Sequence, residues 1–266
     1  MIRDVLRRHH VTPDTDRDQH FLDDRKVVES MVEEAEIEEG DTVLEVGAGL
    51  GTITRFLAEE AGRVLAYEND PELASVLRKE LEDRGNVDIL EEDFSSAEIP
   101  GFDRCVSNIP FHLSTDVVEF LGERQALSVL LVQREFADRL VAEPGEDSYS
   151  RITPAVNYDF LPVYLQDVPR SSFHPEMDVD AALVKLFPRK EDFEVGRRFF
   201  REVVNALFVH SKKKARNAFY DSRHLFDLSR EEAREIRDKL PHSEGRVREL
   251  GAREIVDIAA DLEERL

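Results

Sequence analysis

The feature that most constrains this 266-residue chain is an alternation of short apolar runs with helical patterns that begins at residue 41. Strand-like runs occupy residues 41–47, 63–69, 87–93, 103–109 and 127–133. Segments of helical periodicity lie between and after them, at residues 50–61, 72–83, 114–121 and 134–141. Such alternation builds βαβ units, in which each crossover helix returns the chain so that successive strands run parallel. The sequence therefore predicts an α/β fold around a mostly parallel, Rossmann-like sheet.

The pattern changes after the polar loop at residues 144–151. Two strand-like runs, residues 153–165 and 181–186, predict an antiparallel hairpin at the edge of the sheet. Beyond residue 188 only helical patterns remain, including a capping box formed by Ser229 and Glu232. We therefore expect a large domain over residues 1–188, whose residues 1–18 form a mobile arm, and a small all-α domain over residues 189–266.

A glycine-rich turn follows the first strand, where Gly47, Gly49 and Gly51 are spaced as GxGxG. Glycines after a buried strand let the backbone turn sharply and a ligand approach it closely. Glu68 ends the second strand, where a carboxylate can accept hydrogen bonds from ribose hydroxyls, and Asp93 ends the third, where it can accept from an adenine amine. Either carboxylate alone is more simply a solvated strand end. Together they favour S-adenosylmethionine, which has a ribose and an adenine but no pyrophosphate.

The fourth strand ends in Asn108, Ile109, Pro110 and Phe111. An exocyclic adenine amine is a poor nucleophile because its lone pair is delocalised into the ring. Asn108 Oδ1 and the Ile109 carbonyl are suited to accept both amine hydrogens and so to favour a tetrahedral nitrogen. Pro110 stiffens the turn, and Phe111 can stack on an unstacked base. We interpret this segment as the catalytic one, rather than as a strand ending in a proline turn.

The net charge of −22 argues at first against a nucleic-acid partner, but its distribution is uneven. Residues 189–266 hold 18 basic against 17 acidic side chains, whereas residues 1–188 hold 18 against 41. Within residues 196–224, eight basic side chains face two acidic ones. We expect this basic patch to bind RNA phosphates through four side chains, Lys212, Lys213, Lys214 and Arg216.

Other features narrow the class of protein. No apolar run approaches the eighteen or so residues of a membrane span, and we expect a cytoplasmic protein without a membrane partner. The single cysteine and the scattered histidines predict no metal site. Only 8 of the 36 basic residues are Lys, and carboxylates are abundant, as in a protein from a salt-loving cell.

Several segments resemble the small-subunit ribosomal RNA adenine dimethyltransferases, whose loss gives kasugamycin resistance in bacteria. They are residues 19–22, 45–51, 108–111, 133–145, 172–188 and 208–219. The resemblance implies a class I methyltransferase fold, S-adenosylmethionine as cofactor, and N6,N6-dimethylation of two adjacent adenosines near the 3′ end of small-subunit RNA during ribosome biogenesis. It implies cofactor contacts from six residues, His20, Leu22, Gly47, Glu68, Asp93 and Asn108. It also assigns Phe111 and Phe173 to the target base, and suggests a monomer from a haloarchaeon.

The chain departs from the family at two points, and two other functions stay open. His20 stands where the family usually has Asn, and Ile109-Pro110-Phe111 replaces Leu-Pro-Tyr. One alternative is an adenine N6-methyltransferase of large-subunit RNA, the macrolide-resistance type. The other is a ribosome-assembly factor in which catalysis is dispensable. A nicotinamide dehydrogenase is disfavoured by the GxGxG spacing.

Overall fold

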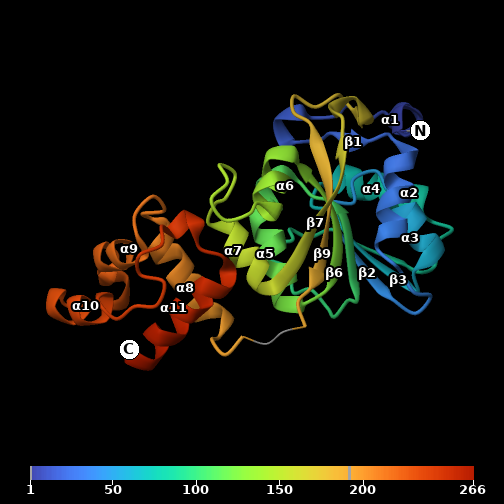
Figure 1. Ribbon diagram of the computed structural model, residues 1–266. Helices are drawn as coiled ribbons and strands as arrows, with labels where there is room; N and C mark the ends of the chain where they lie inside the picture. The colour runs from blue at the N-terminus through green and yellow to red at the C-terminus, as the bar shows by residue number, and fades with distance from the viewer. Residues whose placement is uncertain (1, 191–192) are drawn as a thin grey trace. The chain divides into compact units, whose positions relative to one another are not determined.

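The computed structural model describes residues 2–190 and 193–266, so that Met1, Glu191 and Asp192 of the two predicted domains lie outside the described residues. The chain divides into two compact units (Figure 1). The first comprises Met1–Ala137 and Pro162–Pro188, and the second Asp138–Leu161 and Arg189–Leu266. The predicted single boundary at residue 188 differs from this division, because helix α7 (Ile152–Asp159) packs with α8 (Arg197–Phe208) and α11 (Ala252–Arg265) of the second unit.

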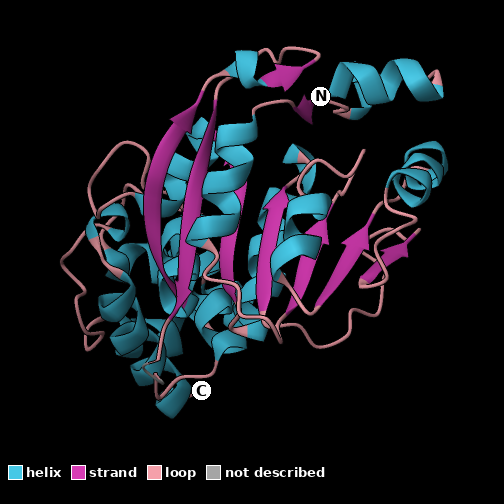
Figure 2. Ribbon diagram, turned by 90° about the vertical axis from the view of Figure 1, so that its right-hand side faces the viewer, coloured by secondary structure: helices cyan, strands magenta, loops and turns pink. Residues whose placement is uncertain are grey.

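The first unit is built on a twisted seven-stranded sheet (Figure 2). In spatial order its strands are β4 (Val87–Leu90), β3 (Arg63–Tyr67), β2 (Thr42–Val46), β5 (Arg104–Asn108), β6 (Leu127–Gln133), β9 (Ala181–Pro188) and β7 (Phe160–Val168). β2 to β6 pair in parallel, and β9 pairs antiparallel with β6. The predicted sheet with an antiparallel edge is thus confirmed. Strands are added outward from β2 through β3 to β4 on one side, and then from β5 to β6 on the other side. Open α/β sheets bind their ligands at such a switch point, which here lies between β2 and β5.

Helices cover both faces of this sheet (Figure 1). Helices α2 (Arg25–Glu34), α3 (Thr54–Glu60) and α4 (Pro71–Glu80) lie on one face, and α5 (Ser114–Arg124) lies on the other. Met31 and Leu57 from the helices of the first face pack with strand residues such as Val64 of β3 and Val106 of β5. All four are at most 1% exposed. The pleat points successive side chains of a strand to opposite faces of the sheet.

The N-terminal segment, which was predicted to be a mobile arm, is helical and packs on the first unit. It forms helix α1 (Ile2–His9) and a short helix at Thr15–Arg17. Ile2, Val5 and Leu6 share one helix face, and they are buried in a cluster with Leu50 and Leu73. Three apolar residues on an otherwise charged segment were too weak a pattern to predict this packing.

Two short strands lie apart from the main sheet. β1 (Phe21–Leu22) follows the N-terminal helices and pairs antiparallel with β8 (Phe173–His174). The loop between β8 and β9 begins with Pro175, which follows His174 through a cis peptide bond. The pairing therefore links the start of the chain to the segment just before β9.

The second unit is helical. Besides α7, its elements are α8 (Arg197–Phe208), α9 (Ala215–Asp221), α10 (Arg230–Arg237), α11 (Ala252–Arg265) and two short 3-10 helices, Arg223–Phe226 and Val247–Glu249. Helix α6 (Arg134–Val141) begins in the first unit and ends in the second. The core of the second unit contains the fully buried side chains of Phe200, Phe219 and Ile258. The predicted capping box is confirmed, because Ser229 Oγ accepts from the Glu232 amide and the Glu232 carboxylate accepts from the Ser229 amide.

The strand predicted at residues 153–165 was wrong in its first half, which is helix α7. Thr153 Oγ1 donates to the Arg139 carbonyl and accepts from the Ser150 amide, which fixes the first turn of this helix. Tertiary contacts of this kind override a β-rich local composition. Among the described residues, no helix is both long and apolar enough to cross a membrane.

Candidate functional site

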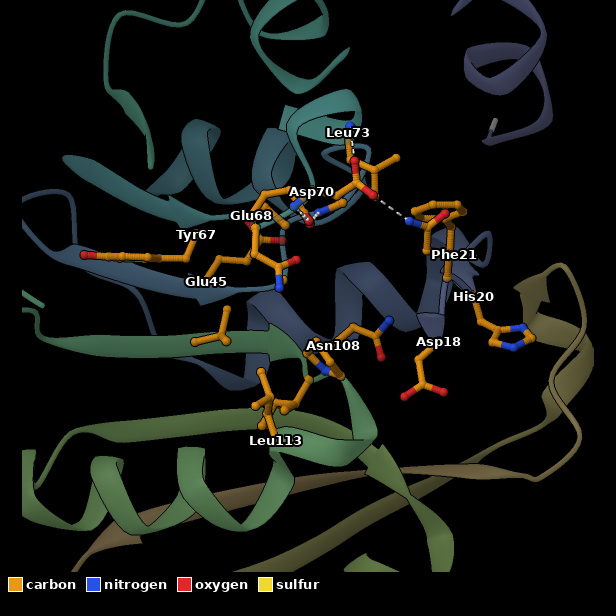
Figure 3. A pocket seen from close by; sticks show the side chains of 18 of the residues that line it. Asp18, His20, Phe21, Glu45, Tyr67, Glu68, Asp70, Leu73, Asn108 and Leu113 are labelled. Atoms are coloured by element: carbon orange, nitrogen blue, oxygen red, sulfur yellow. Dashed lines mark hydrogen bonds between the residues drawn. The ribbon is translucent and has the colours of Figure 1, made fainter. Parts of the chain in front are cut away.

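A cavity of about 530 Å³ opens at the carboxyl ends of β2, β3 and β5 (Figure 3). Its walls come from residues 17–22, 45–50, 67–70, 92–94 and 108–113, with four further residues, Thr52, Ile53, Leu73 and Met177. Of the predicted site residues, ten line it: His20, Leu22, Gly47, Gly49, Glu68, Asp93, Asn108, Ile109, Pro110 and Phe111. Its volume lies in the range of small-molecule sites.

The glycine turn forms the floor of this cavity in a conformation that other residues rarely adopt. Gly47 and Gly49 have φ angles of +75° and +55°. A Cβ atom on Gly47 would lie 3.0 Å from the Pro110 ring, and one on Gly49 would lie 3.3 Å from the Phe21 ring. Glycine at these positions therefore lets residues 108–111, called the Asn108 loop, and the N-terminal segment approach the turn.

Glu68 is held by two backbone amides. One carboxylate oxygen accepts from Gly49 N at 2.8 Å, and the other accepts from Asp70 N at 2.9 Å. The side chain is 6% exposed, and burial raises the pKa of its carboxyl, an effect that these two hydrogen bonds partly offset. Each oxygen keeps a lone pair, so that Glu68 is an oriented acceptor for two neighbouring hydroxyl groups.

Glu45 lies beneath the same turn and is 1% exposed. Burial raises the pKa of its carboxyl to about 8; nearby Thr54 counteracts part of this rise and Glu68 adds to it. Oε2 of Glu45 has no hydrogen-bond partner within residues 2–190 and 193–266. A buried polar atom without a partner is costly, so this oxygen fits a ligand that brings a donor or a positive charge.

Asn108 and Asp93 face the cavity from different strands. Asn108 ends β5, and the described part of the chain offers its side-chain amide no hydrogen bond. Asp93 follows β4, and its Oδ1 accepts from the amide and the hydroxyl of Ser95 at 2.9 and 2.7 Å. The Ser95 hydroxyl, with the amide, holds the pKa of Asp93 below its usual value. Figure 3 shows Asn108 across the cavity from Glu68 and Asp70.

The sequence reasoning missed the charged residues that fasten the N-terminal segment to the cavity. Arg17 and the Gln19 amide both donate to Asp70 Oδ2, at 2.7 and 3.0 Å, while Asp70 Oδ1 caps helix α4. Asp18 lies 3.2 Å from His112, which follows the Asn108 loop. Asp70 before Pro71 is a recognisable helix start, and that signal could have identified one of these residues.

Two predicted site residues, Phe173 and His20, lie differently with respect to the cavity. Phe173 does not line the cavity; it is 4% exposed and packs in the sheet core, because its strand β8 pairs with β1. The predicted contact of Phe173 with the target base stays a prediction. His20 does line the cavity, and its Nδ1 lies 2.9 Å from the Pro175 carbonyl. A carbonyl only accepts, so Nδ1 donates this bond and Nε2 is left for another group.

The predicted RNA-binding side chains lie in the second unit, and three of them pair with acidic neighbours. Lys213 contacts Asp221 at 2.7 Å, and Lys214 contacts Glu244 at 2.6 Å. Arg216 also pairs with Glu244. Glu244 is distant in sequence, so the charge count over residues 196–224 did not include it.

The residues present fit S-adenosylmethionine. Glu68 presents oriented acceptors, and Glu45 has a buried carboxyl oxygen without a partner among the described residues. This set suits a ligand with a diol and positive charge. It presents no cluster of backbone amides and basic side chains for a pyrophosphate.

Comparisons with known proteins agree on the kind of protein. A family model described as ribosomal RNA adenine dimethylase matches residues 14–240. The probable ribosomal RNA small subunit methyltransferase A of Methanosarcina mazei is 36% identical over 263 residues, which cover 97% of this chain and 96% of that protein. The protein of the same description from Methanopyrus kandleri is 38% identical over 254 residues, which cover 93% and 91%.

Two solved structures share the fold over nearly the whole chain. A dimethyladenosine transferase from Plasmodium falciparum superposes with a TM-score of 0.81 at 25% identity, covering 92% of this chain and 98% of that one. The 23S rRNA methyltransferase ErmE superposes with a TM-score of 0.70 at 27% identity, covering 91% and 99%.

Proposed function

Because this chain belongs to the ribosomal RNA adenine dimethylase family, we propose that it transfers methyl groups from S-adenosylmethionine to N6 of two adjacent adenosines near the 3′ end of small-subunit ribosomal RNA. The observation that carries the proposal is a single cavity bounded both by the glycine turn with Glu68 and by the Asn108 loop. Cofactor-binding groups and amine-binding groups therefore face the same space.

The cofactor is held by side chains from successive strand ends. Glu68 accepts from the ribose hydroxyls, and Asp93 Oδ2 accepts from the adenine amine, since Oδ1 is engaged by Ser95. Glu45 presents its free oxygen to the cationic part of the molecule. His20 and Leu22 close the side of the cavity that the N-terminal segment forms. When bound, S-adenosylmethionine supplies the electrophilic methyl group.

The Asn108 loop positions the nucleophile. Asn108 Oδ1 and the Ile109 carbonyl accept the two hydrogens of the adenine amine, which favours a tetrahedral nitrogen with a localised lone pair. Phe111 lines the cavity beside them and stacks on the base, and Pro110 holds the turn against Gly47. The contribution of these residues is orientation and electrostatic alignment. The nitrogen becomes positively charged as it gains the methyl group, and it then loses one of its protons to water.

Small-subunit RNA is preferred to large-subunit RNA as the substrate. Relatives described as small subunit methyltransferase A are 34–38% identical to this chain over most of its length. The dimethyladenosine transferase also superposes better than the 23S rRNA methyltransferase, with TM-scores of 0.81 and 0.70. Both comparisons support the small subunit.

The remaining parts of the proposal concern the setting. The protein acts as a monomer during ribosome biogenesis, in a salt-rich cytoplasm where its 58 carboxylates keep the surface hydrated. The second unit contacts RNA through Lys212, Lys213, Lys214 and Arg216. At molar salt the Debye length is about 3 Å, so the acidic surface repels RNA only at short range.

The test is transfer of labelled methyl from S-adenosylmethionine to small and large ribosomal subunits that lack the modification, at low and high salt. Digestion to nucleosides then identifies the product. Label in N6,N6-dimethyladenosine from the small subunit alone is the expected result. Label in the large subunit would favour the macrolide-resistance type of activity, and no label despite bound cofactor and RNA would favour an assembly factor.

A further inference from the structure

Two loops of the second unit form a paired, strongly basic surface. Residues 211–216 and 243–248 run antiparallel, joined by hydrogen bonds from Ala215 N to the Gly245 carbonyl at 2.8 Å and from Val247 N to the Lys213 carbonyl at 3.0 Å. We call these two segments the basic loop pair. It contains six cationic side chains, Lys212, Lys213, Lys214, Arg216, Arg246 and Arg248, and one acidic side chain, Glu244. Two acidic side chains outside the segments also contact it: Asp221 pairs with Lys213, and Glu249 lies 3.9 Å from Arg246.

Glu244 lies between two of these cations. Its Oε2 lies 2.6 Å from Lys214 Nζ, and its Oε1 pairs with Arg216. The hydrogen bond from Lys214 and the charge of Arg216 hold the pKa of Glu244 below its usual value. Lys214 and Arg216 thus contact the two oxygens of one carboxylate, as Lys and Arg side chains also contact the oxygens of a phosphate group.

The contact is exposed and therefore exchangeable. Glu244 is 60% exposed, Lys214 43% and Arg216 38%. Exposed ion pairs contribute little to stability, whereas RNA offers many phosphates whose binding releases counterions. The backbone of both loops is held by the ladder between them, so breaking the ion pair does not require the loops to move.

From this geometry we propose that Glu244 occupies an RNA phosphate site on the basic loop pair, and that RNA must displace its carboxylate to bind. The inference rests on the proposed function, which makes RNA the substrate, and it adds the exposed Arg246 to the RNA-binding surface. Lys212, which is exposed and shows no ion pair within residues 2–190 and 193–266, is free to make the first contact. Because the Glu244 carboxylate competes for this site, a polyanion that contacts the basic loop pair at this site alone binds with lower affinity.

The test is the affinity of full-length wild-type protein and of Glu244→Gln for an unmodified small-subunit RNA transcript, measured across a range of salt concentrations. Glu244→Gln is expected to bind about three- to tenfold more tightly at low salt. Its plot of log affinity against log salt should be steeper by about one, because no freed carboxylate takes up a cation on binding. The matched control is Glu263→Gln, which also removes an exposed charge, on α11.

A double-substitution cycle separates displacement from general repulsion. In a background carrying Lys214→Met and Arg216→Met there is no ion pair to break, so Glu244→Gln should have a clearly smaller effect than in the wild-type background. An equal effect in both backgrounds, or the same effect from Glu263→Gln, would overturn the proposal. So would an unchanged affinity and salt slope in Glu244→Gln.

The controls also separate this inference from the proposed function. If wild-type protein methylates small-subunit RNA but Glu244→Gln binds that RNA with wild-type affinity, only the displacement of Glu244 by RNA is refuted. Wild-type protein that neither binds RNA nor transfers methyl refutes the function itself. Cofactor affinity should be the same in all variants, because none of the substituted residues lines the cavity.

Discussion

Glu68 accepts a hydrogen bond from the Gly49 amide at 2.8 Å, and this contact ties the end of β3 to the glycine turn that follows β2. Its second oxygen accepts from the Asp70 amide, which ties the same side chain to the start of α4. One carboxylate thus orients three segments of the cavity wall and still presents lone pairs to a ligand.

Glu68→Gln is expected to weaken S-adenosylmethionine binding by about 10- to 100-fold, because a hydrogen bond to a charged acceptor contributes more than one to a neutral acceptor. The amide also offers one acceptor where the carboxylate offers two, so one backbone amide loses its partner. Calorimetric titration measures the effect. Glu92→Gln is the control, since Glu92 lines the same cavity but is exposed. Equal losses of cofactor affinity in the two variants would contradict the role of Glu68 as an oriented acceptor.

Gly47→Ala should distort the turn, because residue 47 has a φ of +75° and a Cβ atom there would lie 3.0 Å from the Pro110 ring. We expect a loss of about 1–3 kcal/mol in the free energy of unfolding and weaker cofactor binding. Gly40→Ala, where a Cβ meets nothing within 4 Å, should change neither by much. Urea unfolding followed by circular dichroism makes the comparison.

Glu45 predicts a pH dependence of stability. Its folded pKa of about 8 lies well above the usual value of 4.5, so the folded state binds the proton more tightly than the unfolded state. Stability should therefore fall as pH rises from about 4.5 to 8, by at most about 1.4 kcal/mol per pH unit from this group. Glu45→Gln should flatten the profile of unfolding free energy over that range. A wild-type slope retained by the variant would assign the dependence to other groups.

The second unit contains a buried ionic cluster between α7 and α8. Asp159, 2% exposed, lies 2.5 Å from Arg197 and 3.5 Å from Arg201. Removing one partner of such a cluster leaves buried charge, so Asp159→Asn should cost about 3 kcal/mol of unfolding free energy at pH 7.5. Glu202→Gln breaks an exposed pair on the same helix and should cost less than about 0.5 kcal/mol. Similar costs for the two would mean that burial does not strengthen the cluster.

The parts of the site that were predictable lie at strand ends. Parallel strands bring their carboxyl ends to one edge of the sheet, so the spacing of Gly47, Glu68, Asp93 and Asn108 along the chain was sufficient to predict that they line one cavity. The fold class followed from the same alternation of strands and helices.

The parts that were missed depend on contacts between distant segments. Phe21 pairs with His174 across more than 150 residues, and this pairing buries Phe173 and brings Arg17 and Asp18 to the cavity. No local pattern encodes such a pairing. The same holds for Glu244, which neutralises part of a basic patch some thirty residues away in sequence.

The central claim is that the Asn108 loop positions the adenine amine beside a separately bound cofactor. It is tested most directly by single-turnover methyl transfer to unmodified small subunits by Asn108→Ala, together with the affinity of that variant for S-adenosylmethionine. The account predicts a rate at least about 100-fold below wild type with cofactor affinity changed only a few-fold. A wild-type rate in this variant would contradict the assignment of Asn108 and of the site built around it.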